Sequence, residues 1–300
     1  MVERITLRKV KNSEELILDR VSTPTYILKS VDWGTIKGTH QSYKYVNQVG
    51  NTISNTALDS RSITIEGWIV ATTSNQMDAS KKKLNSFVNP QDEIDLYYDK
   101  YMIRFVPDET VRYAINESEN NDAFCKFSIV GTCPNPLFTN ADEGVSIFAN
   151  TTPMFHFPLS ISANSPEKGI VFGKRTESLI ANIFNEGSVT SGMRIVFKAN
   201  GNVVNPKLIN VNTQESFVLS KTLIADEEVV INTNIGEKSI KGRIANASYS
   251  NYYMYKDIDS TWLQLKIGDN LFRYDADSGL ENLEILVYYY NRFLEVQECY

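Results

Sequence analysis

Most apolar runs in this chain are short, alternate with polar residues and end at Gly, Pro, Asn, Asp or Ser. Side chains of a β-strand point alternately to the two faces of a sheet, so period-two alternation predicts strands with one buried face. The stretch SITIEGWIV at 62–70 alternates three isoleucines with Thr, Glu and Trp. From about Asn150 onward such runs follow one another at short spacing, with hardly any helical pattern. The chain is therefore expected to adopt a mainly β fold.

The first half combines strands with a single helix. The runs ERITLRKV and EELILDRV, separated by the polar KNS, predict a hairpin. The segment ATTSNQMDASKKKLNSFVNP predicts a helix that is capped by Ser74 or Asp78 and ended by Asn89 and Pro90. The helix ends there because the residue before a proline avoids helical backbone. Four more strands are expected: the two arms of EIDLYYDKYMIRFV around Asp99–Lys100, residues 110–116 and residues 124–131.

Two prolines in the stretch CPNPLF, Pro134 and Pro136, stop the apolar run FCKFSIVG. Proline lacks the N–H that a sheet needs, so the last strand of a first domain is expected to end here. We predict an N-terminal α+β sandwich with one helix over 1–145 and an antiparallel β-sandwich or barrel over 150–300. A length of 300 residues is compatible with two domains.

The composition argues against two classes of partner. The formal net charge is −6, which disfavours nucleic acid, because binding to phosphates needs a basic surface. No window approaches the ~18 consecutive apolar residues of a membrane span. The start, MVERITLRKV, also lacks the apolar core of a signal peptide, so we expect a soluble protein made in the cytosol.

Motifs for catalysis, metal binding or phosphate binding are weak throughout the sequence. The only histidines, His40 and His156, lie far apart, and the three cysteines are widely spaced. The stretch GIVFGKRT lacks the spacing of a phosphate loop, and DADSG lacks the glycine and glutamate of a calcium loop. We therefore predict no catalytic residue, no cofactor and no metal site.

The stretch YSNYYMYKD at 249–257 concentrates aromatic side chains. Aromatic rings present large amphipathic faces on which sugars can stack, but they equally pack sandwich cores and subunit contacts. Both alternatives remain open for the candidate glycan or partner contacts, which are Tyr252, Tyr253, Tyr255 and Trp262.

The order of several segments resembles the distal tail proteins (Dit) of long-tailed phages. DSRSITIEGWI, a helix ending LNSFVNP, and CPNPLF resemble their N-terminal half. Seven further segments resemble the C-terminal half of these proteins: FHFPLSI, GIVFG, NEGSVTSGMRIVFKANG, VVNPKLINVNT, VVINTNIGEKSI, STWLQLKIGDNLFRY and NLEILVYYYNRFLEV. No single motif is diagnostic, whereas their order over nearly the whole chain is.

The resemblance implies a structural protein at the tip of a virion tail, or of a tail-derived bacteriocin, without catalytic residues. It implies a hexameric ring made by a tail-tube-like N-terminal domain, with a galectin-like or jelly-roll domain at the periphery. In some members the last strand returns to the N-terminal domain, here from 288–300. Expected partners are further copies of the chain, the tail tube protein, the tail-associated lysin or baseplate hub, and receptor-binding proteins. DNA would pass through the ring without sequence-specific contacts.

A ring needs exposed strands that pair or pack with a neighbour. Two polar segments are candidate intersubunit arms: residues 38–60, and NESENND at 116–122. The candidate subunit-interface residues are Arg61, Trp68, Asn116 and Asn121. The alternative for each of these residues is an ordinary structural role within a strand or in the core. The alternative for the whole protein is a carbohydrate-binding adhesion module for host cell-wall glycans.

Overall fold

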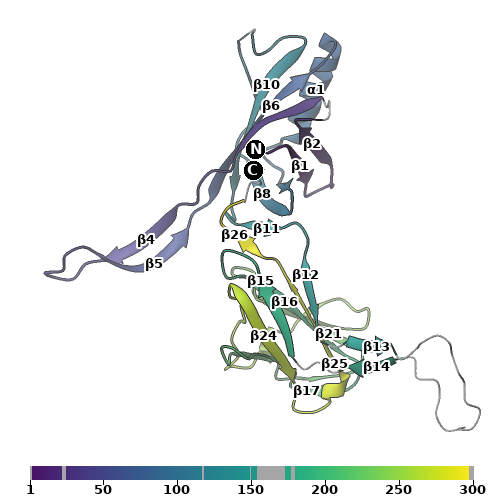
Figure 1. Ribbon diagram of the computed structural model, residues 1–300. Helices are drawn as coiled ribbons and strands as arrows, with labels where there is room; N and C mark the ends of the chain where they lie inside the picture. The colour runs from purple at the N-terminus through teal and green to yellow at the C-terminus, as the bar shows by residue number, and fades with distance from the viewer. Residues whose placement is uncertain are drawn as a thin grey trace, which may run out of the picture. The chain divides into compact units, whose positions relative to one another are not determined.

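The computed structural model describes residues 2–21, 25–116, 118–148, 150–153, 173–176 and 180–296. The chain forms two compact units: unit 1 comprises Met1–Asp142 and Phe293–Tyr300, and unit 2 comprises Glu143–Arg292. Among the described residues β2 and β3 pair in parallel, whereas pairs such as β1–β2 and β16–β21 are antiparallel; Figure 1 labels most of these strands. Only one α-helix occurs among the described residues, so the predicted mainly β fold is confirmed.

Unit 1 contains the helix and about half of the strands. Its elements are β1 (Arg4–Lys9), β2 (Glu15–Asp19), β3 (Tyr26–Asp32), β4 (Gly38–Tyr43), β5 (Thr52–Leu58), β6 (Arg61–Val70), α1 (Ser74–Phe87), β7 (Ile94–Tyr98), β8 (Tyr101–Pro107), β9 (Arg112–Tyr113), β10 (Phe124–Cys133), β11 (Phe138–Asn140) and β26 (Arg292–Phe293). The strands other than β4 and β5 join one sheet in the order β26-β11-β8-β7-β1-β2-β3-β6-β10-β9.

This sheet closes on itself. Strand β10 pairs with β6 on one side and also meets β8, where Gly131 lies opposite Pro107. The approach is close: a Cβ on Gly131 would lie 2.3 Å from a ring carbon of Phe105. Because β8 is linked to β6 through β7, β1, β2 and β3 as well, the strands form a closed circuit around one core.

Helix α1 packs into that core through Met77, Leu84 and Phe87. Its N-cap is Thr73, not the predicted Ser74 or Asp78: the Thr73 hydroxyl accepts from the backbone N–H of Gln76 at 3.3 Å. In return the Gln76 side chain accepts from the backbone N–H of Thr72 at 3.0 Å, one residue before the N-cap position that a capping box would use.

The end of the first unit differs from the sequence prediction. Strand β10 stops at Cys133, just before the two prolines, yet β11 follows and pairs with β8. The chain returns to unit 1 at Phe293, whose ring meets that of Tyr101 at 5.1 Å. The expected strand at 110–116 is shorter, covering Arg112–Tyr113 alone. The predicted strand MFHFPLSI, His156 and Cys299 lie outside the described residues.

Unit 2 is a β-sandwich. Its elements are β12 (Gly144–Ile147), β13 (Asn150–Pro153), β14 (Gly173–Thr176), β15 (Ile180–Asn185), β16 (Met193–Ala199), β17 (Val203–Val204), β18 (Lys207–Asn210), β19 (Ser216–Val218), β20 (Thr222–Leu223), β21 (Glu227–Asn232), β22 (Ser239–Ile244), β23 (Ser250–Asn251), η1 (Tyr253–Tyr255), β24 (Gly268–Asp275), η2 (Leu280–Asn282) and β25 (Leu283–Tyr289). One sheet runs β12-β25-β16-β21-β22-β23 and a second runs β15-β24-β18-β19.

The two sheets of unit 2 share one hydrophobic core. Phe197 and Ile285 come from the first sheet, and Phe217 and Phe272 from the second, and all four are fully buried. In β21 buried side chains alternate with half-buried ones, and in β24 they alternate largely with exposed ones, as the sequence pattern predicts for a sandwich.

Candidate functional site

Strands β4 and β5 form a hairpin that extends away from the rest of unit 1 (Figure 1). We call residues 38–58 the arm. The arm is a sheet of its own, and neither of its strands pairs with another strand among the described residues. Every side chain of β4 is exposed, and so is every side chain of β5 except that of Thr52. The sequence indicated a polar loop here, whereas the structure forms a two-stranded ladder.

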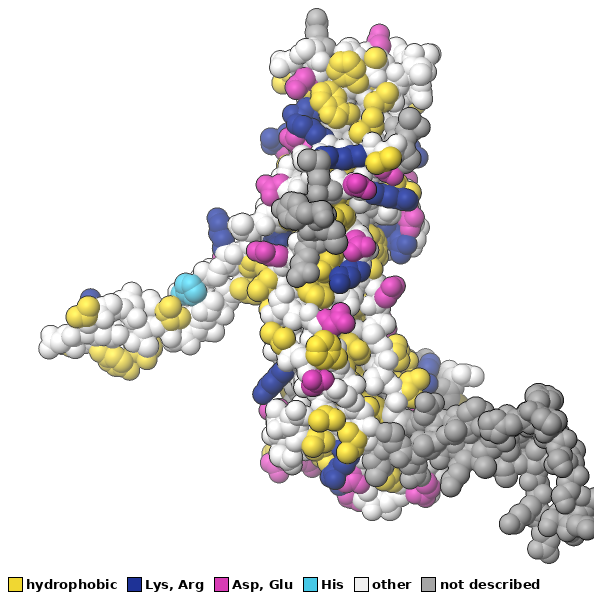
Figure 2. Space-filling view, viewed as in Figure 1, with side chains coloured by type: hydrophobic (Ala, Val, Ile, Leu, Met, Phe, Trp, Pro, Cys, Tyr) yellow, Lys and Arg dark blue, Asp and Glu magenta, His cyan; other side chains and the backbone are white. Residues whose placement is uncertain are grey.

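The outer part of the arm carries exposed apolar side chains (Figure 2). They are Tyr43, Tyr45, Val46, Val49 and Ile53. Val46 is 93% exposed and Val49 is fully exposed, and Lys44 is the one Lys, Arg, Asp or Glu in the arm. Such a set of apolar side chains on a thin element with a single charged residue is typical of a surface that packs against a partner.

Hydrogen bonds fix both ends of the arm. At the tip, the Gln48 side chain accepts from the backbone N–H of Tyr45 at 3.0 Å and donates to the Thr52 hydroxyl at 2.8 Å. At the base, Thr39 donates to the Asp59 carboxylate at 2.7 Å. The arm is thus an ordered hairpin without a core.

Trp68 lies on β6 with its side chain half-buried, on the face opposite the core isoleucines. Its ring packs edge-on against Phe124 of β10 at 5.7 Å. The Glu66 carboxylate beside it pairs with Lys29 at 2.8 Å, and this hydrogen bond lowers the pKa of Glu66. The result is an outward patch in which two aromatic rings adjoin an ion pair, a composition compatible with a subunit contact.

The segment at 116–122 links β9 to β10, with Asn116 and Asn121 both exposed. Asn121 is engaged locally: its side-chain oxygen accepts from the backbone N–H groups of Ala123 and Phe124 at 2.9 and 3.0 Å. The carbonyl of Asn116 accepts from Glu119 N–H at 2.9 Å. Both residues shape the turn, and only Asn116 presents a side chain without such a role.

Arg61 is placed differently from the sequence expectation, because its side chain is 2% exposed. The guanidinium lies 4.6 Å from the ring centroid of Phe138 and donates to the carbonyl of Leu294. Its Nε finds no hydrogen-bond partner among the described residues, and burial lowers the pKa of Arg61. Arg61 therefore holds the returning C-terminal segment within unit 1, and its role in a subunit contact stays a prediction.

The tyrosines at 252–255 in unit 2 separate into two groups. A 3₁₀-helix has three residues per turn, so Tyr252 and Tyr255 share a side, and their rings meet edge-on at 5.2 Å. The Lys221 ammonium lies within 5.5 Å of both ring centroids and forms an ion pair with buried Glu227 at 2.8 Å. A Cβ on Gly242 would lie 2.2 Å from the Tyr252 ring. The ring therefore packs directly against the backbone of β22 at this glycine. These two tyrosines pack against the core.

Tyr253 points outward instead and is 51% exposed. Its ring lies 6.0 Å from that of Trp262, which in turn packs against buried Phe217 at 5.6 Å. Lys238 places its ammonium 5.6 Å from the Trp262 centroid. An open groove of about 370 Å³ beside β22 and β23 is lined by Lys238, Ser239, Ile240, Lys241, Tyr249, Ser250, Asn251 and Tyr253. The sequence identified Tyr253 and Trp262 but gave no sign of the lysines.

The described residues contain no cluster of three or more His, Cys, Asp or Glu side chains with the geometry to hold a metal ion. Within the same part of the chain, no helix has the length and apolar character to cross a membrane.

Comparison with solved structures shows the fold. The structure of phage SPP1 Dit (gp 19.1), described as a paradigm of the hub adsorption apparatus in phages infecting Gram-positive hosts, matches with a TM-score of 0.63. The match has 11% identity and covers 96% of this chain and 99% of that one. A chain of the phage P2 baseplate in its activated conformation matches with a TM-score of 0.49 and 9% identity, covering 97% and 98%. No curated protein sequence matches the chain.

Two family models match successive parts of the sequence. The phage tail protein RIFT-related domain matches residues 18–127, within unit 1, and the C-terminal domain of the siphovirus-type tail component matches residues 186–293, almost all in unit 2. Together they span more than two thirds of the chain, in the order that the sequence segments already indicated. The protein belongs to the distal tail (Dit) family of siphophage tail components.

Proposed function

We propose that this protein forms a closed ring of identical subunits, a hexamer, at the distal end of the tail, and that the arm of each subunit packs against its neighbour. The observation that carries this proposal is the exposed, core-less hairpin β4–β5. An isolated two-stranded hairpin is at best marginally stable in water, and unpaired strand edges invite pairing with another chain. A contact between an arm and a different surface is heterologous, and repeated heterologous contacts close into rings.

The ring would join the tail tube to the lysin or baseplate proteins and anchor receptor-binding proteins, with DNA passing through its centre. The fold shared with SPP1 Dit, a protein described as a hub of an adsorption apparatus, supports this architecture. The role is structural and involves no catalysis. Within this proposal, Trp68 with Phe124, together with the exposed Asn116, supplies the surface that the neighbouring arm contacts.

The test uses the full-length protein and a variant in which Gln41–Asn55 is replaced by Asn-Gly, so that His40 and Thr56, which pair in the structure, flank the new turn. Asn-Gly is favoured in two-residue hairpin turns, so the shortened hairpin keeps its strand pairing near His40 and Thr56. Native mass and negative-stain imaging should show hexameric rings for the full chain and folded monomers for the variant. Rings that persist without the outer arm would rule out its role.

A matched pair of single substitutions separates the arm from general surface effects. Val46 in the arm and Ile258 in unit 2 are both 93% exposed. Val46→Asp should weaken ring assembly by at least about tenfold, because it places a charge in an apolar contact. Ile258→Asp should leave assembly unchanged, and equal losses in both variants would contradict an arm-specific contact.

A further inference from the structure

We propose that the groove beside β22 and β23 in unit 2 binds an acidic saccharide, that is, a sugar ring carrying a carboxylate or a phosphate. This goes beyond the proposed ring-forming role, because it assigns a ligand class to a surface outside the arm and outside the patch of Trp68 and Phe124. The groove volume of about 370 Å³ lies within the range of roughly 300–1,000 Å³ found for small-ligand pockets.

The aromatic side of the groove is rigidly supported. Tyr253 lines the groove and is about half exposed, and its ring lies 6.0 Å from that of Trp262 with an interplanar angle of 36°. Trp262 in turn rests on Phe217, which is fully buried in the core of unit 2. A tyrosine held in this way loses little conformational freedom when a sugar face stacks on it.

The cationic side distinguishes this groove from a neutral sugar site. Lys238 and Lys241 are both exposed, and neither forms an ion pair with a described carboxylate. Lys238 is positioned by the face of Trp262, a contact that leaves its N–H donors available. Glu237 is adjacent in sequence, but its carboxylate accepts from the Asn232 amide at 3.4 Å. In a chain of net charge −6, two lysines lining one groove without an acidic lining residue favour an anionic ligand.

Polar groups complete the groove. Asn251 uses its side-chain oxygen to accept from the backbone N–H of Tyr253 at 2.9 Å, which holds the tyrosine at the groove edge. The amide nitrogen of Asn251 makes no hydrogen bond to the described protein, and neither do the hydroxyls of Ser239 and Ser250. A stacking ring, two cations and several free hydroxyl or amide groups together match the faces, charges and hydroxyls of an acidic sugar.

The test is titration calorimetry of the full-length protein at low salt with two matched probe pairs. One pair is trigalacturonate and its methyl ester, and the other is glucose 6-phosphate and glucose, with inorganic phosphate alone as a fifth ligand. At least one acidic sugar should bind about tenfold or more tightly than its neutral counterpart. Tyr253→Ala should reduce that affinity about tenfold, and Lys238→Gln with Lys241→Gln should remove the preference for the acidic form.

Two controls fix the interpretation. Met254→Ala changes an 80% exposed neighbour of Tyr253 outside the groove lining, and Lys266→Gln removes an exposed lysine elsewhere on unit 2; both should bind like the parent. The proposal is overturned if neither acidic sugar outcompetes its neutral partner, if Tyr253→Ala binds normally, or if inorganic phosphate alone binds as tightly as glucose 6-phosphate. Ring assembly of the Tyr253 variant, checked by native mass, keeps this result separate from the proposed ring.

Discussion

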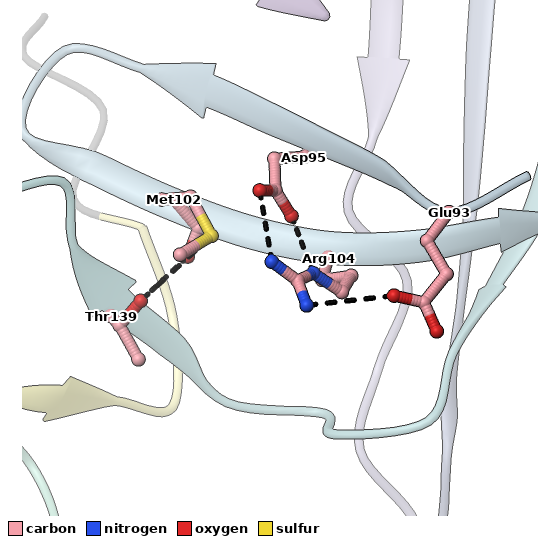
Figure 3. A network of polar contacts seen from close by, with 5 residues as sticks. All are labelled: Glu93, Asp95, Met102, Arg104 and Thr139. Atoms are coloured by element: carbon pink, nitrogen blue, oxygen red, sulfur yellow. Dashed lines mark hydrogen bonds and ion pairs between the residues drawn. The ribbon is translucent and has the colours of Figure 1, made fainter. Parts of the chain in front are cut away.

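Two hairpins of unit 1, β7–β8 and β4–β5, are both antiparallel strand pairs, but their surroundings are opposite. In β7–β8, residues such as Leu96, Ile103 and Phe105 are buried, and the hairpin is flanked by β1 and β11. Arg104 spans the pair, donating to both oxygens of Asp95 at 2.7 and 3.0 Å, while Thr139 of β11 donates to the Met102 carbonyl (Figure 3). In β4–β5 no side chain is buried and no strand flanks the pair.

The difference shows where the stability of a hairpin originates. Ladder hydrogen bonds contribute little net free energy, because the unfolded chain forms equivalent bonds with water. Burial of apolar side chains supplies most of the remainder. The hairpin β7–β8 obtains that burial inside its own chain, whereas the arm can obtain it only from a partner. Four predictions follow for the buried part of unit 1, and three of them set it against the arm.

The largest expected difference lies between equivalent truncations in the two hairpins. Ile103 is 1% exposed and Ile53 is 57% exposed. Ile103→Ala should lower the free energy of unfolding of unit 1 by about 2–5 kcal/mol, since it leaves a cavity. Ile53→Ala should change it by less than about 0.5 kcal/mol in the unassembled protein. Denaturant titration followed by far-UV circular dichroism measures both, and similar losses would break the comparison.

A smaller effect is expected where β10 closes the circuit against β8. A Cβ on Gly131 would clash with the Phe105 ring and lie 2.9 Å from the Val106 carbonyl oxygen. Gly131→Ala should therefore destabilise unit 1 by about 1–3 kcal/mol through overpacking. Gly50→Ala in the arm serves as the contrast, because no atom lies within 4 Å of the position that a Cβ on Gly50 would take. There only its positive φ of 81° opposes the substitution.

The Asp95–Arg104 pair should contribute modestly. The Arg104 side chain is 47% exposed, so solvent screens much of its attraction to the buried Asp95. The hydrogen bond to Asp95 raises the pKa of Arg104. Arg104→Met should cost about 1 kcal/mol, less in high salt, measured as a shift in the urea midpoint. A loss that does not depend on salt would indicate lost packing instead of lost charge.

The smallest effect concerns Cys133 at the end of β10. Burial raises the pKa of this thiol from its ordinary 9.0 to about 12, so the reactive thiolate forms only after unfolding. Because the folded state holds the proton more tightly, stability from this group is complete below pH 9 and declines as the pH rises toward 12. In a Cys299→Ser background, iodoacetamide labelling of Cys133 at pH 8 should be equally slow with and without the outer arm. Faster labelling in the shortened variant would show that the arm supports the core of unit 1.

The elements that could be predicted from the sequence are those with a local signal, such as period-two alternation or a proline. The alternation at 62–70 and the prolines after Cys133 correspond to β6 and to the end of β10. The closure of β8 on β10 is non-local and left no periodic signal. The arm was missed as a ladder because a hairpin without a buried face has no reason to alternate apolar and polar residues.

The candidate site residues could likewise be predicted only where the signal is local in the sequence. Nothing in the sequence separates Tyr253 from Tyr252, since the distinction depends on a 3₁₀ turn and on Gly242 beneath one ring. Arg61 gave no sign of burial, because its acceptor, the carbonyl of Leu294, lies 233 residues away along the chain. For the arm, the apolar set around YKYVNQV was a usable signal: exposed valines and tyrosines beside a turn indicate a partner.

The central claim is that the arm is incomplete without a second subunit. Amide hydrogen exchange, compared between dilute monomer and assembled ring, tests it most directly. The account predicts that the β4–β5 amides exchange within seconds in the monomer and become strongly protected in the ring, while β7–β8 is protected in both. Arm amides that are equally protected in the two states, or unprotected in the ring, would contradict the claim.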